Sequence, residues 1–330
     1  MKRLLIKLIE CQKLTFEESR QLMHGIAHNE MNEAQIAAVL TAFIIRSISI
    51  DELRGFRQAL IDLAVRVNLN NGYGIDLCGT GGDGKNTFNI STASSFVVAA
   101  AGYPVIKHGN YGATSVSGSS NVMEHFGYKF SNDEGKLQRE LDSAGICFLH
   151  APLFHPALKA VGPTRKQLGI KTFFNILGPL VNPANPHYQL SGVYSIEAGR
   201  IYSYFLQAEN KKYIVVHSTD GYDEVSLTAP VRLFSQKGET IMSFTEKGFK
   251  KVLPSDVSGG NTIAESAEIF ISVLENRATP EQNAIVLANS ALAISCIDET
   301  KSIEDSIDAA AETIKSGKAS IVFKKLIKMQ

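Results

Sequence analysis

The sequence lacks the features that disulfide-bonded, zinc-binding and membrane proteins need. Its four cysteines lie far apart and form no CxxC pair: Cys11, Cys78, Cys147 and Cys296. This spacing argues against a disulfide framework or a zinc site and favours a reducing compartment. The longest nearly apolar run, residues 96–106, is about half of the ~20 residues that a membrane helix needs. We therefore expect a cytoplasmic protein.

Neither sign of charge is in excess. Lysine plus arginine and aspartate plus glutamate number 33 each among the 330 residues. A polynucleotide partner would favour a basic excess, so an anionic ligand must be held by local chemistry. The hydrophobic share of 44% and the charged share of 20% are those of an ordinary globular protein. The length exceeds what a single hydrophobic core usually fills, so we expect two lobes.

The first seventy residues have a helical pattern. Three pairs place a capping side chain three residues before Glu or Gln: Thr15 with Glu18, Asn32 with Gln35, and Ser49 with Glu52. Apolar residues at helical spacing follow the last two pairs. The pattern predicts a small helical domain of residues 1–71, to which a helical segment near residues 155–180 returns. The run 68–74 is the candidate hinge.

From residue 75 onward, short apolar runs alternate with helical segments. Strands are expected at 75–78, 104–106, 189–193 and 213–216, and helices near 93–101, 121–126 and 201–208. Such alternation predicts an α/β domain of residues 72–330 with a mainly parallel central sheet. An antiparallel pair is expected within 231–253, and two further helices begin after the capping residues Thr262 and Thr279.

A loop rich in glycine and hydroxyl groups follows the first predicted strand, with the sequence GTGGDGKNTFNIST at residues 79–92. Glycines let backbone amides approach a ligand closely, and the N-terminus of the following helix favours an anion. The loop lacks the Gly-Lys-Ser/Thr of a Walker motif and is not a GxGxxG turn. A tight crossover without a ligand is the alternative. The hydroxyl groups favour a binding site for phosphate.

A second loop, from Lys107 to Ser119, follows the strand predicted to end at Ile106. Ligands of open α/β sheets lie beyond the carboxyl ends of the strands, so the two loops would line one crevice. The alternative is a plain strand-to-helix connection with Lys107 in solvent. His108 is interpreted as a residue that shapes the loop rather than a catalyst.

Two weaker signals come later in the chain. Asp223 and Glu224 follow another predicted strand, where they are either a solvated turn or oxygen ligands of Mg²⁺. Arg165 is either a surface residue or the partner of a substrate carboxylate, which a guanidinium holds through two parallel hydrogen bonds.

Together these four segments closely resemble the anthranilate phosphoribosyltransferase family. The family signature occurs in order as GTGGDG, TFNIST, KHGN and a Gly-Ser pair at residues 79–84, 87–92, 107–110 and 118–119, and the similarity covers essentially the whole chain. The resemblance implies a two-lobe fold of the nucleoside phosphorylase and phosphoribosyltransferase type. It implies transfer of a phosphoribosyl group from 5-phosphoribosyl 1-diphosphate to the amine of anthranilate, in tryptophan biosynthesis, with Mg²⁺. It also implies a homodimer formed through the helical domain.

The resemblance further implies a set of site residues. Contacts to phosphoribosyl diphosphate are expected from Gly79, Gly82, Asp83, Thr87, Asn89, Ile90, Ser91, Thr92, Lys107, His108, Gly109, Asn110, Tyr111, Gly112, Ala113, Thr114, Ser115 and Ser119. Anthranilate would contact Gly79, Asn110 and Arg165, and Mg²⁺ would contact Ser91, Asp223 and Glu224. No covalent nucleophile is implied, and Arg165, Asn110 and Lys107 would position the substrates. Tyr111 departs from the family pattern, in which many members have arginine.

Two alternatives remain open at this point. One is an enzyme like the pyrimidine nucleoside phosphorylases, which share the two-lobe plan but lack the Gly82-Asp83-Gly84 pattern. The other is a non-catalytic relative that binds nucleic acid, against which the zero net charge counts.

Overall fold

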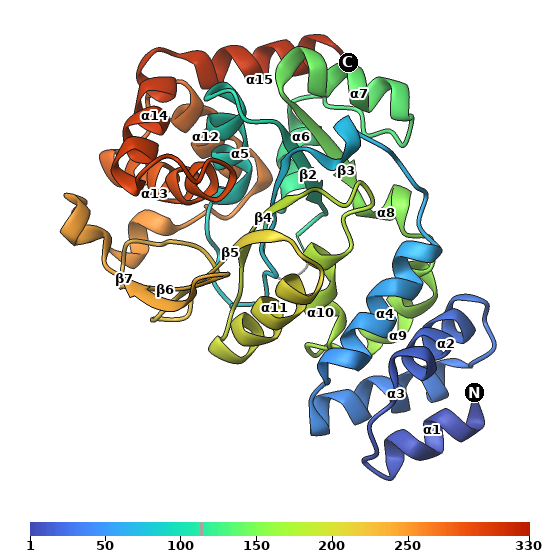
Figure 1. The fold of residues 1–330 in the computed structure, drawn as a ribbon. Helices are drawn as coiled ribbons and strands as arrows, with labels where there is room; N and C mark the ends of the chain where they lie inside the picture. The colour runs from blue at the N-terminus through green and yellow to red at the C-terminus, as the bar shows by residue number, and fades with distance from the viewer. Residues whose placement is uncertain (113–114) are drawn as a thin grey trace. The chain divides into compact units, whose positions relative to one another are not determined.

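The computed structural model describes residues 1–112 and 115–330 (Figure 1). The chain forms two compact units. The helical unit comprises residues 1–67 and 151–183, and the sheet unit comprises residues 68–150 and 184–330. Ala113 and Thr114, two expected contacts of phosphoribosyl diphosphate, lie outside the described residues. No helix in the described part of the chain is long and apolar enough to cross a membrane.

The helical unit is built as the capping pairs predict. It contains α1 (Lys2–Ile9), α2 (Phe16–Ala27), α3 (Glu33–Arg46), α4 (Ile50–Asp62), α8 (Ala151–Phe154), α9 (Leu158–Leu168), α10 (Phe174–Leu177) and η2 (Gly178–Leu180). All three predicted capping boxes are present, at the starts of α2, α3 and α4. Phe43, Phe56 and Phe173 form the aromatic centre of the unit, with ring centroids 4.6–5.4 Å apart. Phe173 comes from the later segment, so both parts of the chain build one core.

A seven-stranded sheet forms the centre of the sheet unit, in the order β3-β2-β1-β4-β5-β6-β7 (Figure 1). Its strands are β1 (Ile75–Leu77), β2 (Val105–Gly109), β3 (Ile146–His150), β4 (Tyr188–Gly192), β5 (Lys212–Ser218), β6 (Val231–Ser235) and β7 (Gly238–Met242). Strands β1 to β5 are parallel to one another, and β6 pairs antiparallel with both β5 and β7. The predicted fold class is therefore confirmed, although β3 was not predicted.

Helices cover both faces of this sheet. The helical elements of the unit are η1 (Asn70–Gly72), α5 (Ile90–Ala100), α6 (Ser119–His125), α7 (Glu134–Ala144), α11 (Ile196–Ala208), η3 (Phe244–Lys247), η4 (Pro254–Val257), α12 (Ile263–Leu274), α13 (Pro280–Ile297), α14 (Ile303–Lys315) and α15 (Lys318–Lys328). On β5, the Tyr213 hydroxyl bonds to Ser203 of α11, whereas Ile214 packs into the core that contains α5 and α13. Successive residues of a strand point to opposite faces, so α11 and α13 lie on opposite sides of the sheet.

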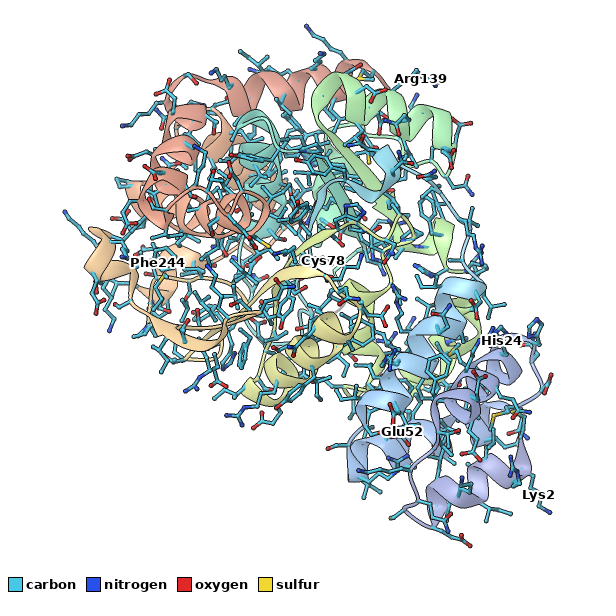
Figure 2. All side chains as sticks on the ribbon, viewed as in Figure 1. Lys2, His24, Glu52, Cys78, Arg139 and Phe244 are labelled. Carbon is cyan, nitrogen blue, oxygen red and sulfur yellow. The ribbon has the colours of Figure 1, made fainter. Side chains whose placement is uncertain are left out.

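Glu52 is a fully buried carboxylate inside the helical unit (Figure 2). It accepts hydrogen bonds from the amides of Leu14 at 2.8 Å and Ser49 at 2.9 Å, and it pairs with the guanidinium of Arg46. Burial raises the pKa of Glu52, but the bonds from Arg46 and from the amides outweigh burial. The pKa therefore lies below its ordinary value.

We predict that Glu52→Gln lowers the free energy of unfolding by about 3 kcal/mol, because it leaves the Arg46 charge without its buried partner. Since the folded pKa is depressed, stabilisation by Glu52 is complete above the unfolded pKa of ~4.3 and is lost as pH falls through the folded pKa. Urea unfolding followed by circular dichroism between pH 7 and pH 3 measures both effects. Glu17→Gln is the control, because Glu17 is exposed and makes one ion pair at 3.6 Å. Equal midpoints for wild type and Glu52→Gln would contradict the prediction.

Candidate active site

The glycine-rich loop, residues 79–92, leaves β1 and enters α5. Gly81, Gly82 and Gly84 have φ angles of 59°, 76° and 75°, a region that glycine adopts without strain. Gly79 is required for space instead, because a Cβ atom there would lie 2.7 Å from a carboxylate oxygen of Asp223. The loop therefore brings its backbone against the segment that follows β5.

That segment, residues 220–224, is called the acidic turn here. The amide of Gly81 donates to the Asp223 carboxylate at 2.8 Å, and the amide of Ser91 donates to the Glu224 carboxylate at 3.0 Å. Ser91 is the second residue of α5, so the positive end of the helix dipole faces Glu224. The structure thus joins two predicted segments whose contacting residues lie 133 and 142 positions apart.

Negative charge is concentrated at this contact. Burial and, after it, repulsion from the neighbouring Asp83 carboxylate raise the pKa of Asp223 to about 7. Burial, then Asp223, then Asp83 raise the pKa of Glu224 well above its ordinary value. Carboxylates that share a desolvated place favour protonation until a cation compensates them. The acidic turn is therefore a place where a cation would be bound favourably.

The carboxylates fit Mg²⁺ that is bound jointly with a phosphate ligand. In the described ranges, no group of three or more His, Cys, Asp or Glu side chains is arranged to hold a metal ion by itself. One carboxylate oxygen of Asp83 is buried and has no hydrogen-bond donor among the described residues. Mg²⁺ is commonly bound by one or two carboxylates, waters and the phosphates of the substrate. Asp223 and Glu224 supply such a partial set of ligands.

The prediction that the second strand ends at Ile106 was wrong. Strand β2 continues to Gly109 and pairs with β3 along five residues. Lys107, expected in a loop, is 1% exposed, and its ammonium group donates to the carbonyl of Leu77. Burial lowers the pKa of Lys107, whereas Cys78, Asp76 and Glu224 raise it. Lys107 can lie inside the sheet because Asp76 of β1 and Glu224 of the acidic turn favour its charged form.

The loop after β2 lies against the glycine-rich loop. Asn89 donates through its side-chain amide to the carbonyl of Ser117 at 3.2 Å, and the side-chain oxygen of Asn86 accepts from the amide of Val116 at 3.3 Å. The two loops are therefore joined by side-chain hydrogen bonds, as expected of segments that lie at the same edge of the sheet.

Other expected contacts differ in exposure. Asn110 is exposed, and its side-chain oxygen accepts from the amide of Tyr111 at 2.8 Å. Tyr111 is 42% exposed and donates from its hydroxyl to Glu124 at 2.6 Å. Ile90 and Thr92 are each 1% exposed. Ile90 belongs to the hydrophobic core of the sheet unit, and Thr92 is buried as well.

Arg165 lies in α9 of the helical unit. Its guanidinium lies 5.5 Å from the Phe174 ring centroid and donates to the side-chain oxygen of Asn175 at 3.5 Å. Burial lowers the pKa of Arg165. No carboxylate of the described residues forms an ion pair with it, so a partly desolvated guanidinium remains available for an anionic ligand.

Asn289, on α13, is a residue that the sequence analysis missed. Its buried side chain accepts from the amide of Val225 at 3.1 Å and donates to the carbonyl of Val225 at 2.9 Å. Val225 follows Glu224 directly, so Asn289 fixes the end of the acidic turn. A cavity of about 20 Å³, lined in part by Ser91, Glu224 and Asn289, leaves room for about one water molecule. No sequence motif marks an asparagine inside a helix for such a role.

We predict that Asn289→Ala lowers the free energy of unfolding by about 2–3 kcal/mol, because both backbone groups of Val225 lose their buried partner. Chemical unfolding followed by fluorescence or circular dichroism measures the loss. Asn261→Ala is the matched control, since Asn261 is exposed in a loop of the same unit. An unfolding midpoint for Asn289→Ala equal to that of the control would contradict the role of Asn289 in holding the end of the acidic turn.

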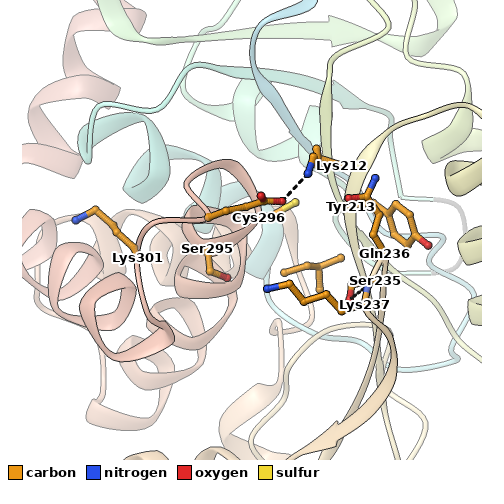
Figure 3. A pocket seen from close by; sticks show the side chains of 10 residues that line it. Lys212, Tyr213, Ser235, Gln236, Lys237, Ser295, Cys296 and Lys301 are labelled. Atoms are coloured by element: carbon orange, nitrogen blue, oxygen red, sulfur yellow. Dashed lines mark hydrogen bonds and ion pairs between the residues drawn. The ribbon is translucent and has the colours of Figure 1, made fainter.

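A larger cavity, of about 190 Å³, lies at the opposite end of the sheet (Figure 3). Lys212, at the start of β5, pairs there with Glu299 at 2.7 Å. Lys237 and Lys301 also line this cavity, beside Ser295 near the C-terminus of α13. The cavity is thus separate from the loops at the carboxyl ends of the strands.

Comparison with known proteins gives the class of this two-unit fold. Residues 2–64 match the helical bundle domain of a glycosyl transferase family, and residues 71–320 match its a/b domain. Anthranilate phosphoribosyltransferases of Christiangramia forsetii and Bacteroides fragilis are 49% and 50% identical over 329 residues, which are 100% of this chain and 99% of each relative.

Solved structures agree with this match. Anthranilate phosphoribosyltransferase of Thermus thermophilus aligns with a TM-score of 0.93 and 28% identity, over 99% of this chain and 98% of that one. The Saccharomyces cerevisiae enzyme in complex with PRPP and Mg shares the fold, with a TM-score of 0.90 and 24% identity over 98% and 96% of the two chains. The chain therefore belongs to the glycosyl transferase family and, within it, to the anthranilate phosphoribosyltransferases.

Proposed function

We propose that this chain transfers the phosphoribosyl group of 5-phosphoribosyl 1-diphosphate to the amine of anthranilate, giving N-(5-phosphoribosyl)anthranilate and diphosphate in tryptophan biosynthesis. The observation that carries the proposal is the contact of the glycine-rich loop and the N-terminus of α5 with the acidic turn. This contact puts backbone donors and carboxylates side by side at strand ends. A diphosphate with its Mg²⁺ needs both kinds of group. Full-length relatives that carry this activity support the choice of substrates.

We further propose that the expected residues of the two loops bind phosphoribosyl diphosphate, and that Ser91, Asp223 and Glu224 hold Mg²⁺. Bound there, Mg²⁺ would supply positive charge to the diphosphate leaving group. The amides of the loop and of the first turn of α5 add donors to the same phosphates. Lys107 adds positive charge to the site from inside the sheet, because its buried ammonium group interacts with the charge of Glu224.

For anthranilate we propose contacts from Gly79, Asn110 and Arg165. Arg165 is suited to a carboxylate, because its guanidinium is partly desolvated and has no acidic partner in the described part of the chain. The aromatic amine of anthranilate is neutral at physiological pH, so it needs no strong base. Aiming that amine at the anomeric carbon is the main task, and positioning of this kind is worth ~7–11 kcal/mol of barrier. No covalent protein nucleophile takes part.

The direct test follows anthranilate fluorescence in a mixture of the protein, anthranilate, phosphoribosyl diphosphate and Mg²⁺. We expect the signal to fall only when all components are present. A constant signal at high protein concentration would overturn the proposed function. Phosphorolysis of a pyrimidine nucleoside under the same conditions would point to the phosphorylase alternative.

We predict that Asp223→Asn and Glu224→Gln each raise the Mg²⁺ concentration needed for half-maximal activity by at least about tenfold, because each removes one charged ligand. Initial rates over a Mg²⁺ series measure the effect. Asp308→Asn is the control, since Asp308 is exposed on α14, in the C-terminal part of the sheet unit. An unchanged Mg²⁺ requirement in both variants would contradict the assignment of the metal site.

We predict that Arg165→Ala raises the KM for anthranilate about 30-fold or more and leaves the KM for phosphoribosyl diphosphate within about threefold, because a charge-assisted hydrogen bond contributes ~1.5–3 kcal/mol. Arg165→Lys should recover little, since an ammonium group does not make two parallel bonds. Lys166→Ala, at the exposed neighbouring position, is the control. Wild-type kinetics for anthranilate in Arg165→Ala would remove Arg165 from the site.

We propose in addition a homodimer formed through the helical unit and a cytoplasmic location. Ile6, Ile9, Ile44 and Ile45 are 40–76% exposed on α1 and α3, an apolar surface of the kind that partners cover. All four cysteines are free, as is usual in a reducing compartment. Sedimentation equilibrium of the full chain tests the dimer, and a monomer at micromolar concentration would overturn it.

A further inference from the structure

Lys85 is a charged residue of the glycine-rich loop that has no role in the site described so far. It is the only Lys or Arg between residues 79 and 92. Its side chain is exposed, and its ammonium group lies 4.7 Å from the centroid of the Tyr222 ring. Tyr222 directly precedes Asp223 and Glu224 of the acidic turn. Lys85 therefore lies beside the place where the negative charge is concentrated.

The backbone around Lys85 is held, whereas its side chain is not. The amide of Lys85 donates to the Asp83 carboxylate at 2.9 Å. The side chain of the next residue, Asn86, donates to the carbonyl of Gly260 at 2.5 Å and accepts from the amide of Val116. A cation over an aromatic ring at an exposed site gains only about 0.5–1 kcal/mol. The ammonium group can therefore leave Tyr222 while the loop keeps its shape.

The other basic residues of residues 79–92 and 107–119 lie in strand β2, and their side chains are buried. Lys107 is 1% exposed and bonds to the carbonyl of Leu77, and His108 is 2% exposed. In the described parts of residues 79–92 and 107–119, Lys85 is thus the only exposed cationic side chain. A diphosphate that entered here would meet Asp83, Asp223 and Glu224 with little positive charge from the protein in reach.

We propose that Lys85 is a substrate-binding residue: its ammonium group moves from the Tyr222 ring to the diphosphate of phosphoribosyl diphosphate. The inference rests on the proposed function and adds one residue to it. The diphosphate carries more negative charge than one divalent ion compensates, and a nearby ammonium group reduces the remaining repulsion from the carboxylates. Lys85 makes and breaks no covalent bond in this role. Because it is exposed in the free protein, little desolvation opposes its movement.

Binding of Mg²⁺-diphosphate to the full-length protein, measured by isothermal titration calorimetry, tests the proposal without turnover. For Lys85→Met we expect about tenfold weaker binding, the loss of one charge-assisted contact. The KM for phosphoribosyl diphosphate should rise in parallel, while kcat and the KM for anthranilate stay within about twofold. Lys85→Arg keeps the charge and should retain most of the affinity. Lys251→Met, at an exposed loop position, should behave as wild type.

Three results would overturn the proposal. The first is equal binding of Mg²⁺-diphosphate by wild type and Lys85→Met. The second is a Lys85→Met variant with a clearly lower Tm and a raised KM for both substrates. This result would show that Lys85 stabilises the folded protein through its contact with Tyr222. The third is a wild-type protein that binds no Mg²⁺-diphosphate, and this result alone would overturn the proposed function as well.

Discussion

The hydrogen bond from the amide of Ser91 to the carboxylate of Glu224 is the contact on which the rest of the site depends. It sets the positive end of α5 against the acidic turn, and the bond from Gly81 to Asp223 adds a second connection between the same segments. Both bonds need the backbone at close range. Asp223 and Glu224 thus lie at the N-terminus of a helix, where a bound anion is usually found. Their negative charge lets the same place bind a cation together with an anionic ligand.

Charge balance explains several other features of the sheet unit. Burial raises the pKa of both Asp223 and Glu224, and repulsion from neighbouring carboxylates adds to the effect. Lys107 compensates part of it from inside the sheet, and Asn289 holds the backbone that carries the turn. None of these side chains is placed by its neighbours in sequence. They come from three separate elements: the acidic turn after β5, strand β2 and helix α13. The parallel strand order β2-β1-β4-β5 puts the ends of β2 and β5 at the same edge of the sheet.

Features that depend on neighbouring residues were predicted well. The capping boxes of the helical unit follow from residue spacing, and the fold class follows from the alternation of apolar runs with helical segments. The glycine-rich loop was singled out because its glycines let backbone amides approach a ligand and its hydroxyl groups favour phosphate. Strand β3 was missed, since a five-residue apolar run is ambiguous without its neighbours in the sheet. Lys107 was assigned to a loop because the apolar run ends at Ile106, and the sequence does not show which distant acidic groups favour its charge inside the sheet.

The sequence by itself determined the local conformations: where helices begin, where the backbone needs glycine, and which residue types could meet phosphate or carboxylate. These follow from interactions within a few residues. Only the tertiary structure decided which charges are buried and what compensates them, as for Lys107 beside Glu224 and Asn289 behind Val225. The free energy of a buried charge depends on groups that the fold brings within a few ångströms, and their separation along the chain says nothing about that distance.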